Sequence, residues 1–215
     1  MFEVLDHGVR LAFIDERPAP HDRLEPILLI HGFASTHAVN WVFPQWVKSL
    51  TEAGRRVIAF DNRGHGRSEK FHDPAAYAMQ KMAEDARALL DHLHIETADV
   101  MGYSMGARIA AFLAKEHASR VRSMILGGLG HHLVDRAGLP LAIAAAMEAP
   151  SLAGLVDPTQ RMFRAFAEAT KERSQGARRL RAGCPPSYER LRSPRNRCSR
   201  ADRGRNQGRC RRRPA

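Results

Sequence analysis

Cysteine is absent from the first 183 residues of this 215-residue sequence, and its three cysteines (Cys184, Cys198 and Cys210) lie near the carboxyl end. A core without cysteine contains no disulfide, and spacings of 14 and 12 residues match no zinc-binding pattern. The scattered histidines show no metal-ligand spacing either. We therefore expect neither a metal nor another cofactor.

Long apolar runs are also absent. No stretch approaches the roughly 20 apolar residues that a transmembrane helix needs. Residues 1–6 lack both the basic start and the long apolar segment of a signal peptide. The sequence therefore predicts a cytoplasmic protein that does not enter a membrane.

Large apolar residues run out before the carboxyl end. No Val, Ile, Phe, Met or Trp follows Phe166. Residues 171–215 carry 16 Lys+Arg against 3 Asp+Glu, whereas residues 1–170 carry 18 against 20, so the formal net charge of +11 comes from the last segment. Such a segment cannot bury enough apolar surface to offset the entropy lost when it is ordered. We predict a folded domain over residues 1–170 and a disordered, arginine-rich tail over residues 171–215.

Two short apolar runs break into glycine and polar residues. Ile27–Ile30 leads into residues 31–34, and Val57–Phe60 leads into the glycine-rich residues 61–68. This pattern is typical of a strand buried on both faces of a parallel sheet, with a functional loop at its carboxyl end. Because ligands of open α/β sheets bind outside these ends, we expect the two loops to converge on one site.

The other predicted elements alternate between strand and helix, which favours an α/β fold with a mostly parallel sheet flanked by helices. A hairpin is expected near the amino end, and two late helices look like the start of a helical lid. The predicted elements are strands at Phe2–Leu5, Val9–Ile14 and Val121–Leu126, and helices at Asn40–Ala53, Ala75–Leu93, Leu139–Met147 and Pro158–Arg173.

The most informative motif spans residues 102–106, Gly-Tyr-Ser-Met-Gly. It matches G-x-S-x-G, follows the strand-like segment Ala98–Met101 and precedes the helix-forming segment Met105–Lys115. In this context the pattern marks a nucleophilic serine on a sharp turn from strand to helix. The glycines are needed because the backbone of the serine is strained and because strand and helix crowd together. Ser104 is therefore the predicted catalytic nucleophile.

Together, residues 31–33, 61–68 and 102–106 resemble the motifs of the α/β-hydrolase fold family, in its order, and the likeness extends over about residues 1–170. The resemblance implies a hydrolase whose serine acts on an ester-like or other carbonyl group of a small-molecule substrate. It assigns the backbone N–H groups of Phe33 and Met105 to the oxyanion hole, where pre-aimed amides stabilise a tetrahedral intermediate. A serine at this position argues against the branches that use aspartate, such as epoxide hydrolases and dehalogenases.

The family's catalytic order is Ser, then Asp or Glu, then His, and the sequence does not complete it. The last histidine is His132, and Glu116 is the only acid between it and Ser104. Glu116 and His117 lie at least twelve residues along the helix from Ser104, about 18 Å, which is out of reach. No strand-borne acid accompanies His131 and His132 in the family's place. The resemblance therefore predicts an incomplete α/β-hydrolase fold without its last strands, largely inactive because the triad Asp and His are missing.

The basic tail has two interpretations. Its bias toward Arg, Pro, Gly, Cys and Ser is typical of a GC-rich gene read out of frame. On this interpretation the native carboxyl-terminal third has been lost, and the break lies between about Arg173 and Cys184. The other interpretation is a genuine basic tail on a small domain. Two functional alternatives also stay open: a non-catalytic relic of the fold, or a weak and non-specific nucleic-acid binder through the tail, whose one aromatic residue is Tyr188.

Other polar and aromatic residues have structural interpretations. Asp61 could be catalytic because it follows a strand, yet a carboxylate there usually organises its loop through backbone hydrogen bonds. We interpret His31 as a brace for the oxyanion loop and His65 as a structural or surface residue. The aromatic residues at positions 41, 43 and 46 are predicted to lie in the core.

Overall fold

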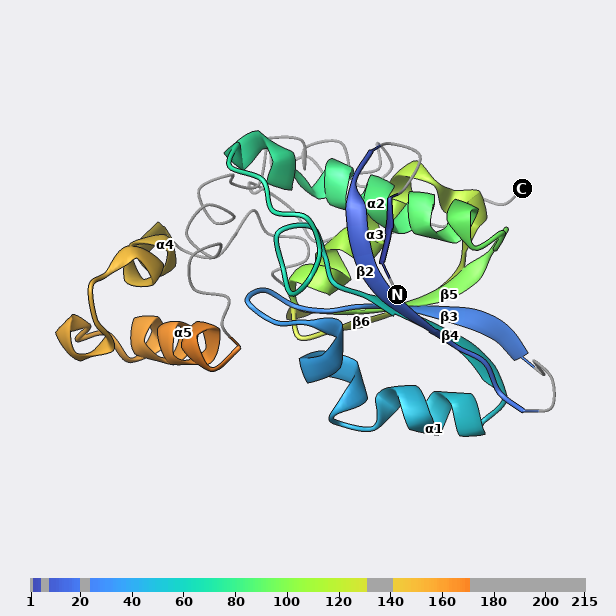
Figure 1. The fold of residues 1–215 in the computed structure, drawn as a ribbon, viewed down its shortest axis with the longest axis horizontal. Coiled ribbons are helices and arrows are strands. Elements are labelled where there is room, and N and C mark those ends of the chain that lie inside the picture. Colours follow the sequence, from blue (N-terminus) through green and yellow to red (C-terminus); the bar gives the residue numbers. More distant parts are fainter. Residues whose placement is uncertain (1, 5–7, 20–23, 131–140, 171–215) are drawn as a thin grey trace, which may run out of the picture. The chain divides into compact units, whose positions relative to one another are not determined.

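The computed structural model describes residues 2–4, 8–19, 24–130 and 141–170. Its sheet has six strands in the order β1-β2-β4-β3-β5-β6 (Figure 1). Strands β4, β3, β5 and β6 are parallel to one another, whereas β2 runs antiparallel to β4 and to β1. The strands are β1 (Phe2–Val4), β2 (Arg10–Glu16), β3 (Leu24–Ile30), β4 (Arg55–Phe60), β5 (Ala98–Tyr103) and β6 (Val121–Gly127).

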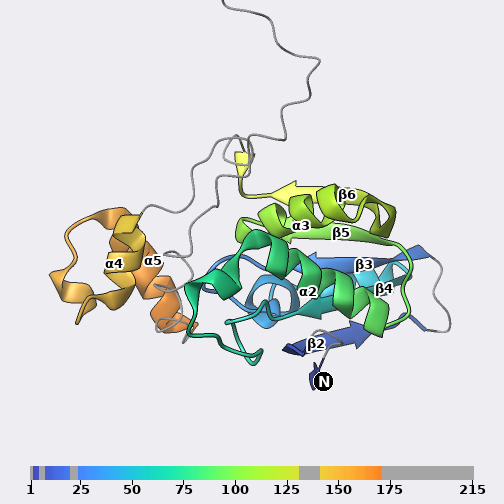
Figure 2. The same ribbon diagram turned by 90° about the horizontal axis from the view of Figure 1, so that it is seen from above.

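Helices cover both faces of the sheet. Helix α1 lies on one face, and α2 and α3 lie on the other (Figures 1 and 2). The helices are α1 (Trp46–Glu52), α2 (Met79–His92), α3 (Met105–Glu116), α4 (Leu141–Glu148) and α5 (Pro158–Ala169), with short helical turns η1 (Ala38–Val42), η2 (Pro74–Tyr77), η3 (Ala118–Arg120) and η5 (Leu152–Gly154). This layered arrangement confirms the predicted α/β class. Within the described ranges, no helix combines the length and the apolar character needed to cross a membrane.

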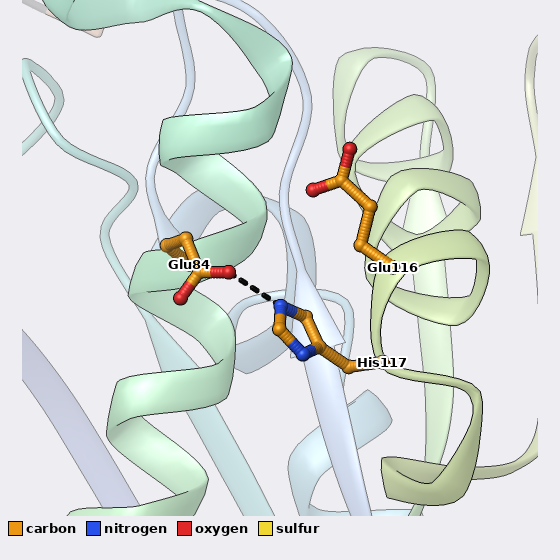
Figure 3. Close-up of side chains that lie close together, drawn as sticks. All are labelled: Glu84, Glu116 and His117. Carbon is orange, nitrogen blue, oxygen red and sulfur yellow. Dashed lines mark hydrogen bonds and ion pairs between the residues drawn. The ribbon is translucent and has the colours of Figure 1, made fainter.

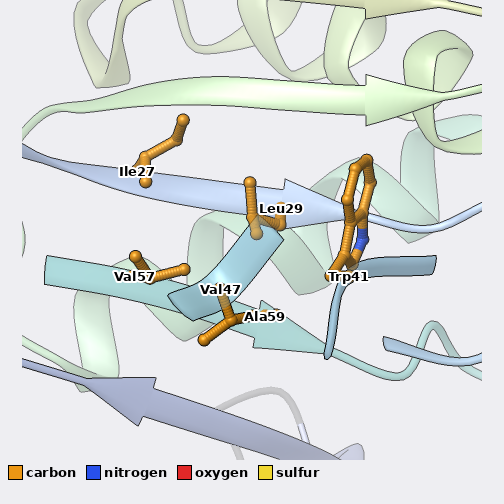
Figure 4. Packing of buried hydrophobic residues seen from close by; sticks show 6 residues of the cluster. All are labelled: Ile27, Leu29, Trp41, Val47, Val57 and Ala59. Carbon is orange, nitrogen blue, oxygen red and sulfur yellow. The ribbon is translucent and has the colours of Figure 1, made fainter. Parts of the chain in front are cut away.

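The two apolar runs form the centre of the core. Ile27–Ile30 and Val57–Phe60 are buried throughout, as expected for strands covered on both faces. Since side chains alternate along a strand, every second residue faces α1 and the others face α2 and α3. Figure 4 shows the cluster on the α1 side, which consists of Ile27, Leu29, Trp41, Val47, Val57 and Ala59.

The single helix predicted over Asn40–Ala53 is wrong, because the chain is interrupted at Pro44. Helical turn η1 ends at Val42, and α1 begins at Trp46 after Gln45, whose φ of 68° is left-handed. Phe43 before the proline is still helical, with φ −62° and ψ −40°, so the break falls after Pro44, which removes a backbone donor. The break also corrects the aromatic prediction: Trp41 is buried, but Phe43 and Trp46 are 72% and 44% exposed.

The predicted helix over Ala75–Leu93 is confirmed with one change. Turn η2 and helix α2 are separated at Ala78, whose ψ of 138° is extended. The buried stripe of α2 includes Met82, Ala86, Leu89 and Leu90, in agreement with its sequence pattern.

At both ends of residues 1–170, the secondary structure of the described residues agrees with the predicted elements. Strands β1 and β2 form the expected hairpin, and α4 and α5 form the two expected late helices. Residues 5–7, 139–140 and 171–173 lie outside the described residues. The same holds for the rest of the tail, so the division into residues 1–170 and 171–215 stays a prediction.

Candidate active site

Ser104 lies on a sharp turn between β5 and α3. Its φ of 54° and ψ of −115° place a non-glycine residue in a strained conformation. Its N–H donates to the carbonyl oxygen of Gly127 at 2.8 Å, which ties the turn to the end of β6. Its side chain makes no capping hydrogen bond to α3, although serine is a common capping residue. Within the described residues, Oγ of Ser104 therefore does not cap helix α3.

The glycines on either side of Ser104 have no room for a side chain. A Cβ on Gly102 would lie 2.4 Å from the carbonyl oxygen of Gly106, and one on Gly106 would lie 2.0 Å from that of Ile30. Both neighbours are backbone atoms, so neither can rotate away. This crowding is the physical reason for the glycines of the G-x-S-x-G motif.

The loop after β3 lies directly beside the serine turn. A Cβ on Gly32 would be 3.5 Å from Cβ of Ser104. Phe33, the next residue, is buried, and Met105 packs against the same apolar cluster. Met105 is the first residue of α3, and N–H groups in the first turn of a helix have no acceptor within that helix. Ser104, Phe33 and Met105, which the sequence predicts as site residues, thus lie in one region.

His31 fixes the backbone of this loop through both ring nitrogens. Its Nε2 accepts the N–H of Asn62 at 2.9 Å, and its Nδ1 bonds to the carbonyl oxygen of Gly32 at 2.8 Å. The amide of Asn62 returns a bond to the His31 carbonyl oxygen at 3.0 Å. The ring of His65 packs edge-on against the ring of His31 and is fully buried, so His65 is structural and not a surface residue. These contacts agree with the interpretation of His31 as a brace.

Asp61 organises the loop after β4, as predicted. Its Oδ1 accepts the backbone N–H of His37 at 2.9 Å, and its Oδ2 accepts the N–H of Arg67 at 2.9 Å. Nδ1 of His37 also bonds to Oδ1 at 2.7 Å, a side-chain partner that sequence reasoning missed. Burial alone would raise the pKa of Asp61, but the hydrogen bonds from His37 and from the Arg67 N–H outweigh it and lower the pKa.

The general base of a catalytic triad is not found beside Ser104 in the described residues. Glu116 and His117 lie at the opposite end of α3, as the helix length predicts. His131 and His132 lie outside the described residues. No hydrogen bond in the described ranges involves Oγ of Ser104, so the serine is positioned but has no base within them.

Comparison with known proteins identifies the family. The sequence profile of the alpha/beta hydrolase fold family matches residues 25–181. The chain belongs to the α/β-hydrolase fold family. The match includes Phe33, Asp61 and Ser104, which carry the sequence resemblance.

Curated relatives of this α/β hydrolase include several enzymes. A segment of 107 residues is 42% identical to 2-hydroxymuconate semialdehyde hydrolase of Pseudomonas sp. (strain CF600), covering 48% of this chain and 36% of that protein. Another match, over 146 residues, is 33% identical to rhodomycin D methylesterase of Streptomyces peucetius and covers 64% of this chain and 45% of that protein. The chain thus spans less than half the length of these relatives.

Solved structures support the same fold. The esterase EaEST from Exiguobacterium antarcticum superposes with a TM-score of 0.61 at 20% identity, covering 85% of this chain and 72% of that one. At this level of identity the likeness concerns the fold. The two curated relatives named above are a hydrolase and a methylesterase.

Proposed function

We propose that Ser104 is the nucleophile of a hydrolase that acts on an ester-like or related carbonyl group of a small molecule. The observation that carries this proposal is the strained backbone of Ser104 between a buried strand and a helix, flanked by glycines that cannot accept a Cβ. A turn of this kind holds the hydroxyl at the carboxyl edge of the sheet, where the substrates of α/β folds bind.

The proposed chemistry is acyl transfer. Oγ of Ser104 attacks the carbonyl carbon, its proton passes to a base, and the carbonyl oxygen becomes an oxyanion. The backbone N–H groups of Phe33 and Met105 donate to that oxyanion. The bond to the alcohol then breaks as the base returns its proton to the leaving oxygen, and water later hydrolyses the acyl group from Ser104. Two features support this assignment: Gly32 lies beside Ser104, and the ring of His31 fixes the loop that carries Phe33.

The substrate has an apolar part next to the reacting carbonyl. Phe33 and Ala34 pack with residues of α4 and α5, and Met105 and Phe163 border the same cluster. The end of α5 is tied to this loop because the hydroxyl of Thr170 donates to the carbonyl oxygen of Ala34 at 2.7 Å. Apolar side chains beside an oxyanion site favour an alkyl or aryl ester over a charged one. The methylesterase among the relatives is consistent with this class.

The 215-residue chain has little activity of its own. No histidine follows His132 in the sequence, and a triad histidine normally follows the acid in this family. The hydroxyl of an unassisted serine is a weak nucleophile at neutral pH. A non-catalytic relic of the fold is therefore the alternative within the family.

A fluorophosphonate probe tests the assignment of Ser104. We expect slow modification of the purified chain, with the adduct on the peptide that contains Ser104 and none in Ser104→Ala. A matched control is Ser123→Ala, because Ser123 is exposed on β6 and should leave labelling unchanged. Equal labelling of Ser104→Ala and the original chain would contradict the proposal.

The arginine-rich tail supports a second proposal, weak and non-specific binding of nucleic acid. Its 16 Lys+Arg against 3 Asp+Glu would bind phosphates by charge alone. Binding of a fluorescent oligonucleotide should fall steeply with salt and be lost in a chain that ends at Thr170. Equal binding by both chains would exclude the tail as the site.

A further inference from the structure

A group of three potential metal ligands lies between α2 and the end of α3, away from Ser104. Glu84 comes from α2, Glu116 is the last residue of α3, and His117 follows it directly. One ligand atom from each residue lies within 4.8 Å of the other two. In Figure 3 the ring of His117 points toward Glu84, and the Glu116 carboxyl group lies beside them. Residues 33 positions apart in the sequence are thus brought together by the packing of α2 on α3.

Two of these side chains are already held in place. The His117 ring nitrogen Nε2 bonds to Oε1 of Glu84, and the His117 backbone N–H donates to the Leu113 carbonyl oxygen at 2.8 Å. The second carboxylate oxygen of Glu84 accepts Nε of Arg87 at 2.7 Å.

Arg87, the arginine beside the group, contacts more than one carboxylate. It pairs with Glu84 and with Asp91, and Asp91 also pairs with Arg120. The carboxyl end of α3 adds the negative end of a helix dipole.

We propose that Glu84, Glu116 and His117 bind a divalent transition-metal ion such as Zn²⁺. Imidazole nitrogen and carboxylate oxygen are ordinary ligands of Zn²⁺, and three protein ligands leave a fourth position for water. The ion would replace the hydrogen bond between His117 and Glu84, while Arg87 stays on the other Glu84 oxygen as an outer partner.

The geometry requires two adjustments: Nε2 of His117 and Oε1 of Glu84, now hydrogen-bonded, must move apart, and the wider separations must shorten. Tetrahedral bonds of about 2.0–2.2 Å place ligand atoms about 3.4 Å apart. The three ligand atoms now lie within 4.8 Å of one another, so a side chain must rotate to bring the more distant atoms closer. Glu116 is exposed, so its carboxylate can turn toward the ion without disturbing the core. The site lies about 18 Å along α3 from Ser104 and would join two helices, not take part in ester hydrolysis.

The test uses the full 215-residue chain with Cys184, Cys198 and Cys210 replaced by serine, because cysteine thiolates would also bind Zn²⁺. Zn²⁺ is titrated against a chromophoric chelator, and thermal unfolding is followed with and without the ion. We expect one ion per chain and a higher Tm with Zn²⁺, because a ligand that binds the folded state stabilises it.

The variants decide between a metal site and a simple ion pair. His117→Ala and Glu116→Gln should each weaken Zn²⁺ binding by about 10- to 100-fold or more, since loss of outer-shell partners alone has that effect. His94→Asn removes an exposed histidine elsewhere and should leave the affinity unchanged. Glu116→Gln changes an exposed side chain, so it keeps the test decisive if His117→Ala fails to fold. No binding, or binding equally strong in Glu116→Gln, would overturn the proposal.

Discussion

The alpha carbon of Gly106 lies so close to the Ile30 carbonyl that a Cβ on Gly106 would be 2.0 Å from the oxygen. The contact joins the start of α3 to the end of β3. It therefore sets the distance between the serine turn and the loop that carries Phe33, the two parts of the proposed site.

Gly106→Ala should destabilise the fold strongly. The new methyl group would meet backbone atoms, and overpacking of this kind costs about 3 kcal/mol. We expect a lower urea midpoint by circular dichroism. Gly154→Ala is the matched control because its Cβ would have its nearest neighbour at 4.0 Å, and its effect should stay within about 0.5 kcal/mol. Similar midpoints for both variants would show that the crowding at Gly106 is relieved at no cost.

Asp61 should make stability depend on acid pH. Its pKa in the folded chain lies below its usual value, because the hydrogen bonds from His37 and Arg67 outweigh the effect of burial. A group with a lowered folded pKa contributes its full stability above the unfolded pKa of about 3.9 and loses it as pH falls through the folded value. Urea midpoints measured from pH 6 down to pH 3 should therefore fall at the acid end.

Asp61→Asn should reduce that acid dependence and destabilise the chain at neutral pH. An amide keeps one acceptor oxygen but points NH₂ at a backbone donor, which costs about 1–3 kcal/mol. Asp157→Asn is the control, because Asp157 is an exposed helix cap and asparagine caps helices equally well. A neutral-pH midpoint for Asp61→Asn equal to that of the original chain would contradict this role.

Strand β6 should promote self-association. Among the described residues it forms the edge of the sheet, and Met124 and Ile125 on it are 43% and 55% exposed. Exposed apolar edge strands pair with other chains, and a charged side chain prevents this. Ile125→Lys should shift the chain toward monomer in light scattering, whereas Val156→Lys, at a 92% exposed residue outside the sheet, should not. An unchanged size distribution for Ile125→Lys would exclude β6 as the contact.

Much of this architecture could be predicted from local patterns. The buried runs before residues 31 and 61 indicated parallel strands because both faces of such strands are covered. The G-x-S-x-G motif predicted a crowded turn because only glycine tolerates contact with a neighbouring backbone. Both features are confirmed, at Ile27–Ile30, at Val57–Phe60 and at Gly106.

Interactions between distant segments could not be predicted in this way. His37 and Asp61 are 24 residues apart and Glu84 and His117 are 33 apart, and neither spacing has a local periodicity. They meet because loops or helices pack side by side. The break at Pro44 is different, since proline gave a local signal that the aromatic residues around it obscured.

Ester turnover tests the central claim most directly. Loss of the triad histidine alone costs a serine hydrolase on the order of 10⁶ in turnover. The purified 215-residue chain should therefore hydrolyse 4-nitrophenyl butyrate no faster than Ser104→Ala does, at a rate near the uncatalysed background. An ordinary enzymatic rate that Ser104→Ala abolishes would contradict the account, and His131 and His132 would then be the first candidates for the base.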